Sequence, residues 1–249
     1  MAGDKFIESS YEKALIALFQ ELGYTYECGY DVERDYREPF YREVLEASLK
    51  RLNKGVSADI LAEGLKMVTN LNEGTLIQDN RRFTEMLQNG FAVPYLENGE
   101  SRTATLRLVD FEQPLANDFR IVNQWSVEEL GKIRCDMVVM INGLPLVVVE
   151  LKTASDENVT IEDAYLQIRN YMKKCPSLFG YNAFCVISDL AQSKAGTITS
   201  KFERFMEWKS EDGNYETKLI ADYATFFKGM FMRERLIDIL KNYICFDLN

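Results

Sequence analysis

The feature that most constrains the fold of this chain is a hairpin signal near its middle. Two apolar runs rich in valine, residues 134–141 and 145–152, have the dipeptide Asn142-Gly143 between them. An Asn-Gly pair between two such runs is the strongest short-range signal for an antiparallel β-hairpin. The pattern therefore predicts two neighbouring core strands, around which the rest of the chain must be arranged.

The segments on either side of this hairpin change their hydrophobic period along the chain. Apolar residues at helical spacing come first, with Ser57 as a candidate N-cap and Gly90 as a candidate stop. We expect helices over residues 6–22, 44–52, 58–71, 76–87, 160–174 and 220–246, and strands over residues 103–111, 119–127, 134–141, 145–152 and 184–188. This order predicts the α/β class, as an α+β arrangement in which helices flank a mixed sheet.

The domain organisation follows from length and from the absence of any linker-like composition. A chain of 249 residues that is 47% hydrophobic can bury one sizeable core. We expect one domain over residues 1–223 and a helical tail over residues 224–249. The tail carries many apolar side chains, among them Phe226, Phe227 and Phe231. They pack either on the domain itself or on a further domain that the tail joins.

Composition removes several classes of function. The chain has no histidine, which excludes imidazole bases, Ser-His and Cys-His nucleophile pairs and histidine-based zinc sites. The five cysteines are odd in number and widely spaced, which is typical of reduced thiols. There is no apolar run long enough to span a membrane and no secretory signal at the start, so we expect a cytoplasmic location.

The net charge of −10 makes non-specific binding to nucleic acid by the whole surface unfavourable. Local basic patches are still candidates for phosphate contacts. They are Arg81-Arg82, Lys173-Lys174 and the group formed by Lys228, Arg233, Arg235 and Lys241.

Charged residues at the ends of the two hairpin strands are the candidates for chemistry. Glu150 and Lys152 share one face of their strand with Val148. Asp136 lies on the preceding strand, and the turn decides its partner. A two-residue turn places Asp136 opposite Val149, whereas a three-residue loop or a bulge places it opposite Glu150, with Cβ atoms about 4.5–5.5 Å apart.

Two carboxylates this close repel each other at neutral pH unless a divalent cation lies between them. Oxygen ligands without histidine or cysteine suit magnesium or manganese. Lys152 on the same face could then stabilise charge on a phosphate or help to deprotonate a water molecule. The alternative is a salt-bridged strand end with a structural role only.

Asp136, Glu150 and Lys152 on a hairpin followed by a helix resemble the PD-(D/E)XK nuclease superfamily. Residues 110–197 further resemble the N-terminal nuclease domain of the type I restriction enzyme R subunit, which is a motor and endonuclease protein. The similarity includes the phrase NGLPLVVVELK, the turn 156–158 (Asp-Glu-Asn), and a Q-x-x-x-Y element here formed by Gln167 and Tyr171.

The resemblance implies a PD-(D/E)XK restriction-endonuclease-like fold and a metal site held by Asp136, Glu150 and the Leu151 carbonyl. It also places an acidic residue of the first helix, Glu12 or Glu8, near the metal. Lys152 would act on the water and the phosphate, and Gln167 and Tyr171 would position the DNA backbone.

The function that this resemblance implies is Mg²⁺-dependent endonucleolytic cleavage of double-stranded DNA, independent of sequence, with Mn²⁺ as a substitute. No G-x-x-x-x-G-K-[ST] phosphate loop occurs, so ATP would act only through a helicase motor domain outside this chain. The expected partners are that motor domain and the modification and specificity subunits. Two alternatives stay open: a non-catalytic DNA-binding or assembly module, and a stand-alone PD-(D/E)XK nuclease of another restriction or repair system.

Overall fold

The computed structural model of the chain describes residues 2–72, 74–152, 160–189, 191–212 and 223–246, with side chains from residue 10 onward. Its centre is a mixed six-stranded sheet with the strand order β1-β4-β5-β6-β7-β8. Strand β1 is parallel to β4 and β6 is parallel to β7, while the other neighbours are antiparallel. The strands are β1 (Thr25–Cys28), β4 (Phe119–Glu128), β5 (Lys132–Ile141), β6 (Leu144–Leu151), β7 (Phe184–Ser188) and β8 (Ser193–Gly196).

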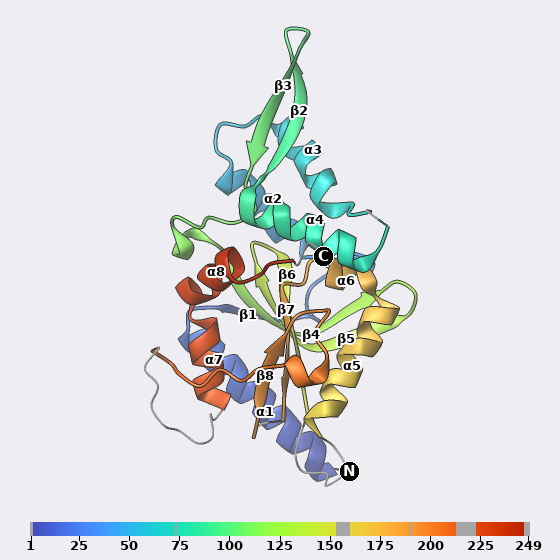
Figure 1. Cartoon of the computed structure of the whole chain (residues 1–249), viewed down its shortest axis with the longest axis vertical. Coiled ribbons are helices and arrows are strands. Elements are labelled where there is room, and N and C mark those ends of the chain that lie inside the picture. The colour runs from blue at the N-terminus through green and yellow to red at the C-terminus, as the bar shows by residue number, and fades with distance from the viewer. Residues whose placement is uncertain (1, 73, 153–159, 190, 213–222, 247–249) are drawn as a thin grey trace.

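Helices cover both faces of this sheet, which confirms the predicted mixed α/β arrangement (Figure 1). Buried residues form two clusters: α1, α7 and α8 contribute to one, and α5 and α6 contribute to the other. The helices are α1 (Ala2–Glu21), α2 (Arg42–Leu52), α3 (Ala58–Thr69), α4 (Leu76–Asn89), α5 (Ile161–Lys174), α6 (Pro176–Gly180), α7 (Tyr223–Phe231) and α8 (Arg233–Asn242), with short 3-10 helices at Pro114–Ala116 and Phe202–Arg204.

Several helix ends follow directly from local sequence. The Ser57 side chain accepts a hydrogen bond from the backbone N–H of Ile60 and caps α3, as predicted. Gly90 ends α4 with a φ of 72°, a conformation that glycine adopts without strain. At the start of α5, the Thr160 N–H donates to Asp163 in a capping box.

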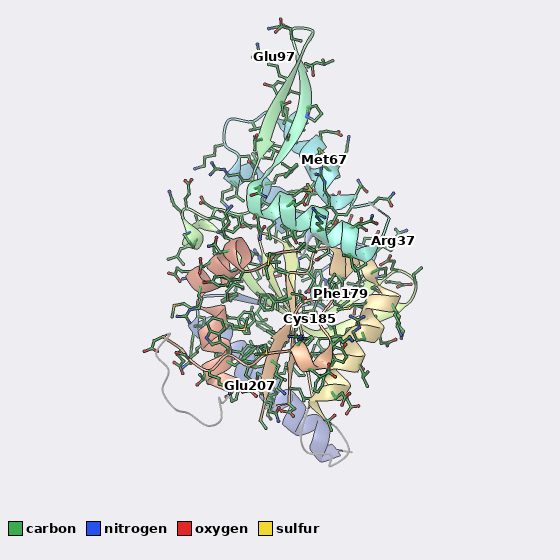
Figure 2. All side chains as sticks on the ribbon, in the orientation of Figure 1. Arg37, Met67, Glu97, Phe179, Cys185 and Glu207 are labelled. Atoms are coloured by element: carbon green, nitrogen blue, oxygen red, sulfur yellow. The ribbon has the colours of Figure 1, made fainter. Side chains whose placement is uncertain are left out.

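A second, two-stranded sheet projects from the body of the molecule. It consists of β2 (Phe91–Glu97) and β3 (Glu100–Leu106), and Figure 1 shows it beyond α2, α3 and α4. Glu97 lies near its outer end in Figure 2, whereas Phe179 and Cys185 lie in the interior of the body. The sequence pattern predicted none of β1, β2 and β8, and it placed the C-terminal end of the strand at 103–111 five residues beyond the end of β3.

The helical tail forms two helices where one was predicted, with a break at Met232. Phe226, Phe227 and Phe231 of α7 are almost fully buried and belong to the same cluster as Phe19 of α1. The Phe19 ring lies 5.2 Å from the Phe231 ring, in an edge-to-face arrangement. The described part of the tail therefore packs on the domain.

Two predictions from composition concern the cysteines and the membrane. All five cysteines are free thiols. Among the described residues, no helix combines the length and the apolar character needed to cross a membrane.

Candidate active site

The register between β5 and β6 decides which side chains meet. Ile141 pairs with Leu144, so Asn142 and Gly143 form a two-residue turn, with φ values of 54° and 82°. The register then shifts between Val139 and Met140, after which Val139 pairs with Val147 and Met137 with Val149.

This shift is a β-bulge in β6, because Leu146 is passed over between the pairs Met140–Pro145 and Val139–Val147. The two-residue turn alone would place Asp136 opposite Val149, and the bulge shifts this register by one residue. Continued one residue past the last pair, Met137 with Val149, this register places Asp136 on the side of Glu150. The expectation that a bulge or a longer loop must place these two acids on one face is confirmed, and the structure uses the bulge.

Strands β5 and β6 separate just beyond the pair Met137–Val149. The last β5–β6 pair is Met137 with Val149, and beyond it Glu150 and Leu151 keep only their pairing with β7 on the other edge of β6. The Leu151 N–H donates to Asp136 Oδ2 over 2.8 Å, so the Asp136 carboxylate takes the place of a strand partner. Asp136 is therefore fixed at the fork between the two strands.

Glu150 is the most deeply buried charged group in this region, at 1% exposure. Lys152 Nζ donates to Glu150 Oε1 over 2.7 Å. Glu150 Oε2 is buried and has no hydrogen-bond partner among the described residues. Burial first, and then repulsion by Asp136, raise the pKa of Glu150 to about 8, although the neighbouring Lys152 acts in the opposite direction.

Lys152 directly follows β6 and is anchored at two points. Its backbone N–H donates to the Ser188 carbonyl over 2.8 Å, and its ammonium group holds Glu150. The side chain retains 21% exposure, so it lies between the buried acid and solvent. This position allows the ammonium group to meet an anion that enters from outside.

Helix α5 brings the Q-x-x-x-Y pair over the same face of the sheet. Gln167 Nε2 donates to the Tyr171 hydroxyl over 2.9 Å, and that hydroxyl donates to the Arg134 carbonyl over 2.8 Å. Burial, followed by the nearby Glu150 charge, raises the pKa of Tyr171 well above its ordinary value. Tyr171 is thus a neutral hydrogen-bonding group that ties α5 to β5.

A pocket of about 640 Å³ joins these groups. Asp136, Glu150, Lys152, Gln167 and Tyr171 all line it. The five residues that the sequence assigned to chemistry, from three separate elements, therefore meet in one place. Leu151 is not among the lining residues: its N–H holds Asp136, and its side chain is buried on the opposite face with Val149.

Of the two acidic candidates of α1, the structure describes the side chain of Glu12 alone, and it lies outside this pocket. Glu12 accepts hydrogen bonds from the side chains of Asn123 and Gln124 in β4, and it does not line the pocket. The Glu8 side chain and the segment 156–158 lie outside the described residues.

Further residues line the pocket wall, and of these the sequence had singled out only Lys174, as part of the basic pair Lys173-Lys174. Lys132 and Arg134 come from β5, Lys174 and Asn170 from α5, and Tyr30 from the loop after β1. A signal for them was present, because Lys132, Arg134 and Asp136 alternate along one strand face. Lys174 follows Tyr171 by three residues on α5, the spacing of neighbours on one helix face.

The donor set suits a hard divalent cation. Glu150 Oε2 is a buried acceptor with no partner in the described structure, and Asp136 lines the same pocket. Within the described residues, no group of three histidine, cysteine or acidic side chains could hold a metal. Two carboxylates are nevertheless sufficient for Mg²⁺, which usually keeps several waters and takes further ligands from substrate phosphates.

Comparison with known proteins gives a consistent result. Residues 5–204 match the family described as the type I restriction enzyme R protein N terminus. A protein named as an MjaIXP type I restriction enzyme endonuclease subunit, from Methanocaldococcus jannaschii, is 31% identical over 95% of this chain and 25% of its own length. The type I restriction enzyme HindI endonuclease subunit of Haemophilus influenzae is 30% identical over 96% of this chain and 24% of its own length.

A third relative, the type I restriction enzyme EcoprrI endonuclease subunit of Escherichia coli, is 31% identical over 59% of the chain and 48% of its own length. The chain thus spans about a quarter of the length of the first two relatives.

Proposed function

The chain belongs to the type I restriction enzyme R protein N-terminus family, and from this premise we propose that it is the DNA-cleaving domain of a type I restriction endonuclease subunit. The reaction is hydrolysis of a DNA phosphodiester at the pocket between β5, β6 and α5. The observation that carries the proposal is the register of the hairpin, which brings Asp136 beside the buried Glu150. The fold proposed for it is that of the PD-(D/E)XK nucleases.

In this proposal Asp136 and Glu150 hold one Mg²⁺ or Mn²⁺ ion. When bound, the ion supplies Lewis-acid stabilisation of the phosphate charge. Glu150 contributes the oxygen that has no hydrogen-bond partner in the described structure, and Asp136 is presented by its bond to the Leu151 N–H. The Leu151 carbonyl is a candidate for a further ligand.

Lys152 acts on the substrate side of Glu150. Its ammonium group lies at the boundary between the buried acid and solvent, where it can orient a water molecule and stabilise negative charge on the phosphate. Gln167 and Tyr171 position this wall of the pocket, because the Tyr171 hydroxyl is committed to the Arg134 carbonyl. Sequence independence of the cleavage is part of the same proposal, because the pocket residues named here would contact the phosphate backbone and not the bases.

The role of ATP and the identity of the partners belong to the same proposal. ATP acts through a helicase motor domain outside this chain, and the modification and specificity subunits supply recognition of the DNA sequence.

The first test is calorimetric titration of the chain with Mn²⁺. We expect one ion to bind to the wild type, and Asp136→Asn or Glu150→Gln to weaken the affinity at least tenfold, which is a loss of about 1.4 kcal/mol or more. The exposed-site variant Glu203→Gln serves as the matched control. Unchanged affinity in both site variants would show that the acid pair is structural.

The second test separates chemistry from assembly. In a complete R subunit carrying this domain, assembled with its partner subunits, Lys152→Ala should reduce plasmid cleavage by roughly 10²–10³-fold, as expected for loss of a group that stabilises transition-state charge. ATP hydrolysis should continue. If cleavage persisted and only subunit association changed, the domain would be an assembly module.

A further inference from the structure

Three cations line the pocket beside the acid pair without forming ion pairs. Lys132, Arg134 and Lys174 are exposed side chains in the pocket wall. None of them has a salt bridge within the described parts of the chain, whereas Arg42 pairs with Glu38 and Arg120 pairs with Glu27 and Asp118. In a chain with a net charge of −10, such a group of uncompensated cations indicates an anion-binding surface.

The two cations of β5 are held by aromatic residues of the loop that follows β1. Lys132 Nζ lies 5.1 Å from the centre of the Tyr36 ring. Arg134 Nη1 donates to the Tyr30 hydroxyl, and the Tyr30 side chain is 58% exposed. These contacts direct the charges toward the pocket and reduce the conformational entropy that they would lose on binding a ligand.

The third cation is held by the turn between β4 and β5. The Leu130 N–H donates to the Lys174 carbonyl over 2.9 Å, which joins the end of α5 to this turn. The aliphatic part of Lys174 lies across Gly131, where an added Cβ would be 3.4 Å from its Cγ and Cδ atoms. Lys174 therefore lies near the end of β5 that carries Lys132.

The spacing of the strand cations relates them to the acid pair. Lys132, Arg134 and Asp136 alternate along β5, and only Asp136 among them is partly buried. Alternate residues of an antiparallel strand lie about 6.8 Å apart. This step is comparable with the separation of successive phosphates along one DNA strand.

We propose that Lys132, Arg134 and Lys174, called here the rim cations, bind backbone phosphates of the DNA on one side of the bond that is cut. The inference rests on the proposed function, since it takes the scissile phosphate to lie at Asp136 and Glu150. Tyr30 is a positioning residue that acts through Arg134. The surface reads phosphates and not bases, so it adds affinity without sequence preference.

The salt dependence of DNA binding tests this proposal. We would measure the binding of a fluorescein-labelled 30-base-pair duplex by fluorescence anisotropy, with EDTA present to exclude metal, between 50 and 200 mM KCl. Each phosphate contact contributes about 0.9 to the slope of log K against log salt concentration, so replacing all three rim cations by glutamine should lower the slope by about 2.7. The control Lys50→Gln/Lys54→Gln/Lys201→Gln makes the same change of charge at exposed positions outside the pocket.

Two further variants separate charge from position. Arg134→Lys should keep most of the slope, because it keeps the charge. Tyr30→Phe should weaken binding about two- to tenfold with the slope unchanged, since it removes one hydrogen bond and no charge. An unchanged slope in the rim variant, an equal fall in the control, or no binding by the wild type at 50 mM KCl would overturn the proposal.

A measurement on the unmodified chain covers the case in which the triple variant does not fold. Acetylation with acetic anhydride, followed by mass spectrometry, should show that the duplex protects Lys132 and Lys174 but not Lys50 or Lys54. Equal modification with and without DNA would contradict the proposal.

The result of the salt-dependence experiment does not depend on the result of the Mn²⁺ titration. Glu150→Gln should keep the full salt slope while losing Mn²⁺ affinity. Loss of the rim effect with Mn²⁺ binding intact would overturn only this inference. A rim effect without any Mn²⁺ binding at Asp136 and Glu150 would overturn only the proposed metal-dependent cleavage.

Discussion

Replacing Glu150 by glutamine should make the metal-free chain more stable at alkaline pH, although it removes an ion pair. Glu150 is 1% exposed, its Oε2 atom has no hydrogen-bond partner in the described structure, and Asp136 lines the same pocket. The Lys152 ammonium group compensates only one of its two oxygens. A glutamine keeps an oxygen for Lys152 without placing a charge in this position.

The direction and size of the difference in unfolding free energy between the two proteins follow from the raised pKa of Glu150. Because its pKa is about 8 in the fold against an ordinary value of 4.5, the folded chain keeps a proton that the unfolded chain releases between these pH values. The stabilising contribution is full below pH 4.5 and is lost as the pH rises through 8. At about 1.4 kcal/mol for each pH unit, wild type should lose about 4 kcal/mol relative to Glu150→Gln between pH 5 and pH 9.

Urea unfolding of both proteins at a series of pH values, in EDTA, measures this difference directly. Titrations that the two proteins share cancel in the comparison, and the exposed-site variant Glu203→Gln should follow wild type throughout. Mn²⁺ at about 100 times its dissociation constant for wild type should restore about 2.7 kcal/mol to wild type at pH 8 and at most about 1.4 kcal/mol to Glu150→Gln, whose affinity is at least tenfold weaker. If the difference between the two proteins were constant from pH 5 to pH 9, the reasoning about the buried carboxylate would be refuted.

Three other predictions concern the hairpin and the pocket. Gly143→Ala should cost about 2–4 kcal/mol in urea unfolding, because its φ is 82° and the new Cβ would lie 2.5 Å from a backbone nitrogen of α2; a cost below 1 kcal/mol would show that the turn can relax. Tyr171→Phe should cost about 1 kcal/mol through loss of the bond to the Arg134 carbonyl, and an unchanged unfolding midpoint would contradict that bond. Asp136→Asn should change the free energy of unfolding by less than about 1 kcal/mol, because asparagine can still accept from the Leu151 N–H; a larger loss would mean that the charge of Asp136 stabilises the fold.

The candidate residues could be found from the sequence because the signals that identify them are local. Asn142-Gly143 specifies a turn through the positive φ values that these two residues tolerate, and the capping box of α5 lies within four consecutive residues. Hydrophobic alternation then predicts which side chains share a face. The sequence thus determined the hairpin, the helix that follows it, and the candidates Asp136 and Glu150.

Whether these acids meet was decided only by tertiary structure. The two-residue turn alone would have placed Asp136 opposite Val149, and the bulge at Leu146 corrects the register by one residue. The turn is also held from outside, since the Tyr41 N–H donates to the Gly143 carbonyl over 2.8 Å. A bulge costs little locally and depends on what packs around the strand, so no short sequence pattern announces it.

Long-range pairing explains the remaining differences. Strand β1 has four residues and pairs with β4, about 95 positions along the chain, so its local signal is weak. The apolar residues of the tail showed that some surface must cover them, but only the folded chain identifies that surface as α1 and the sheet. Turns and helix caps are fixed by atoms a few residues apart, whereas register, strand partners and buried charge depend on packing between distant segments.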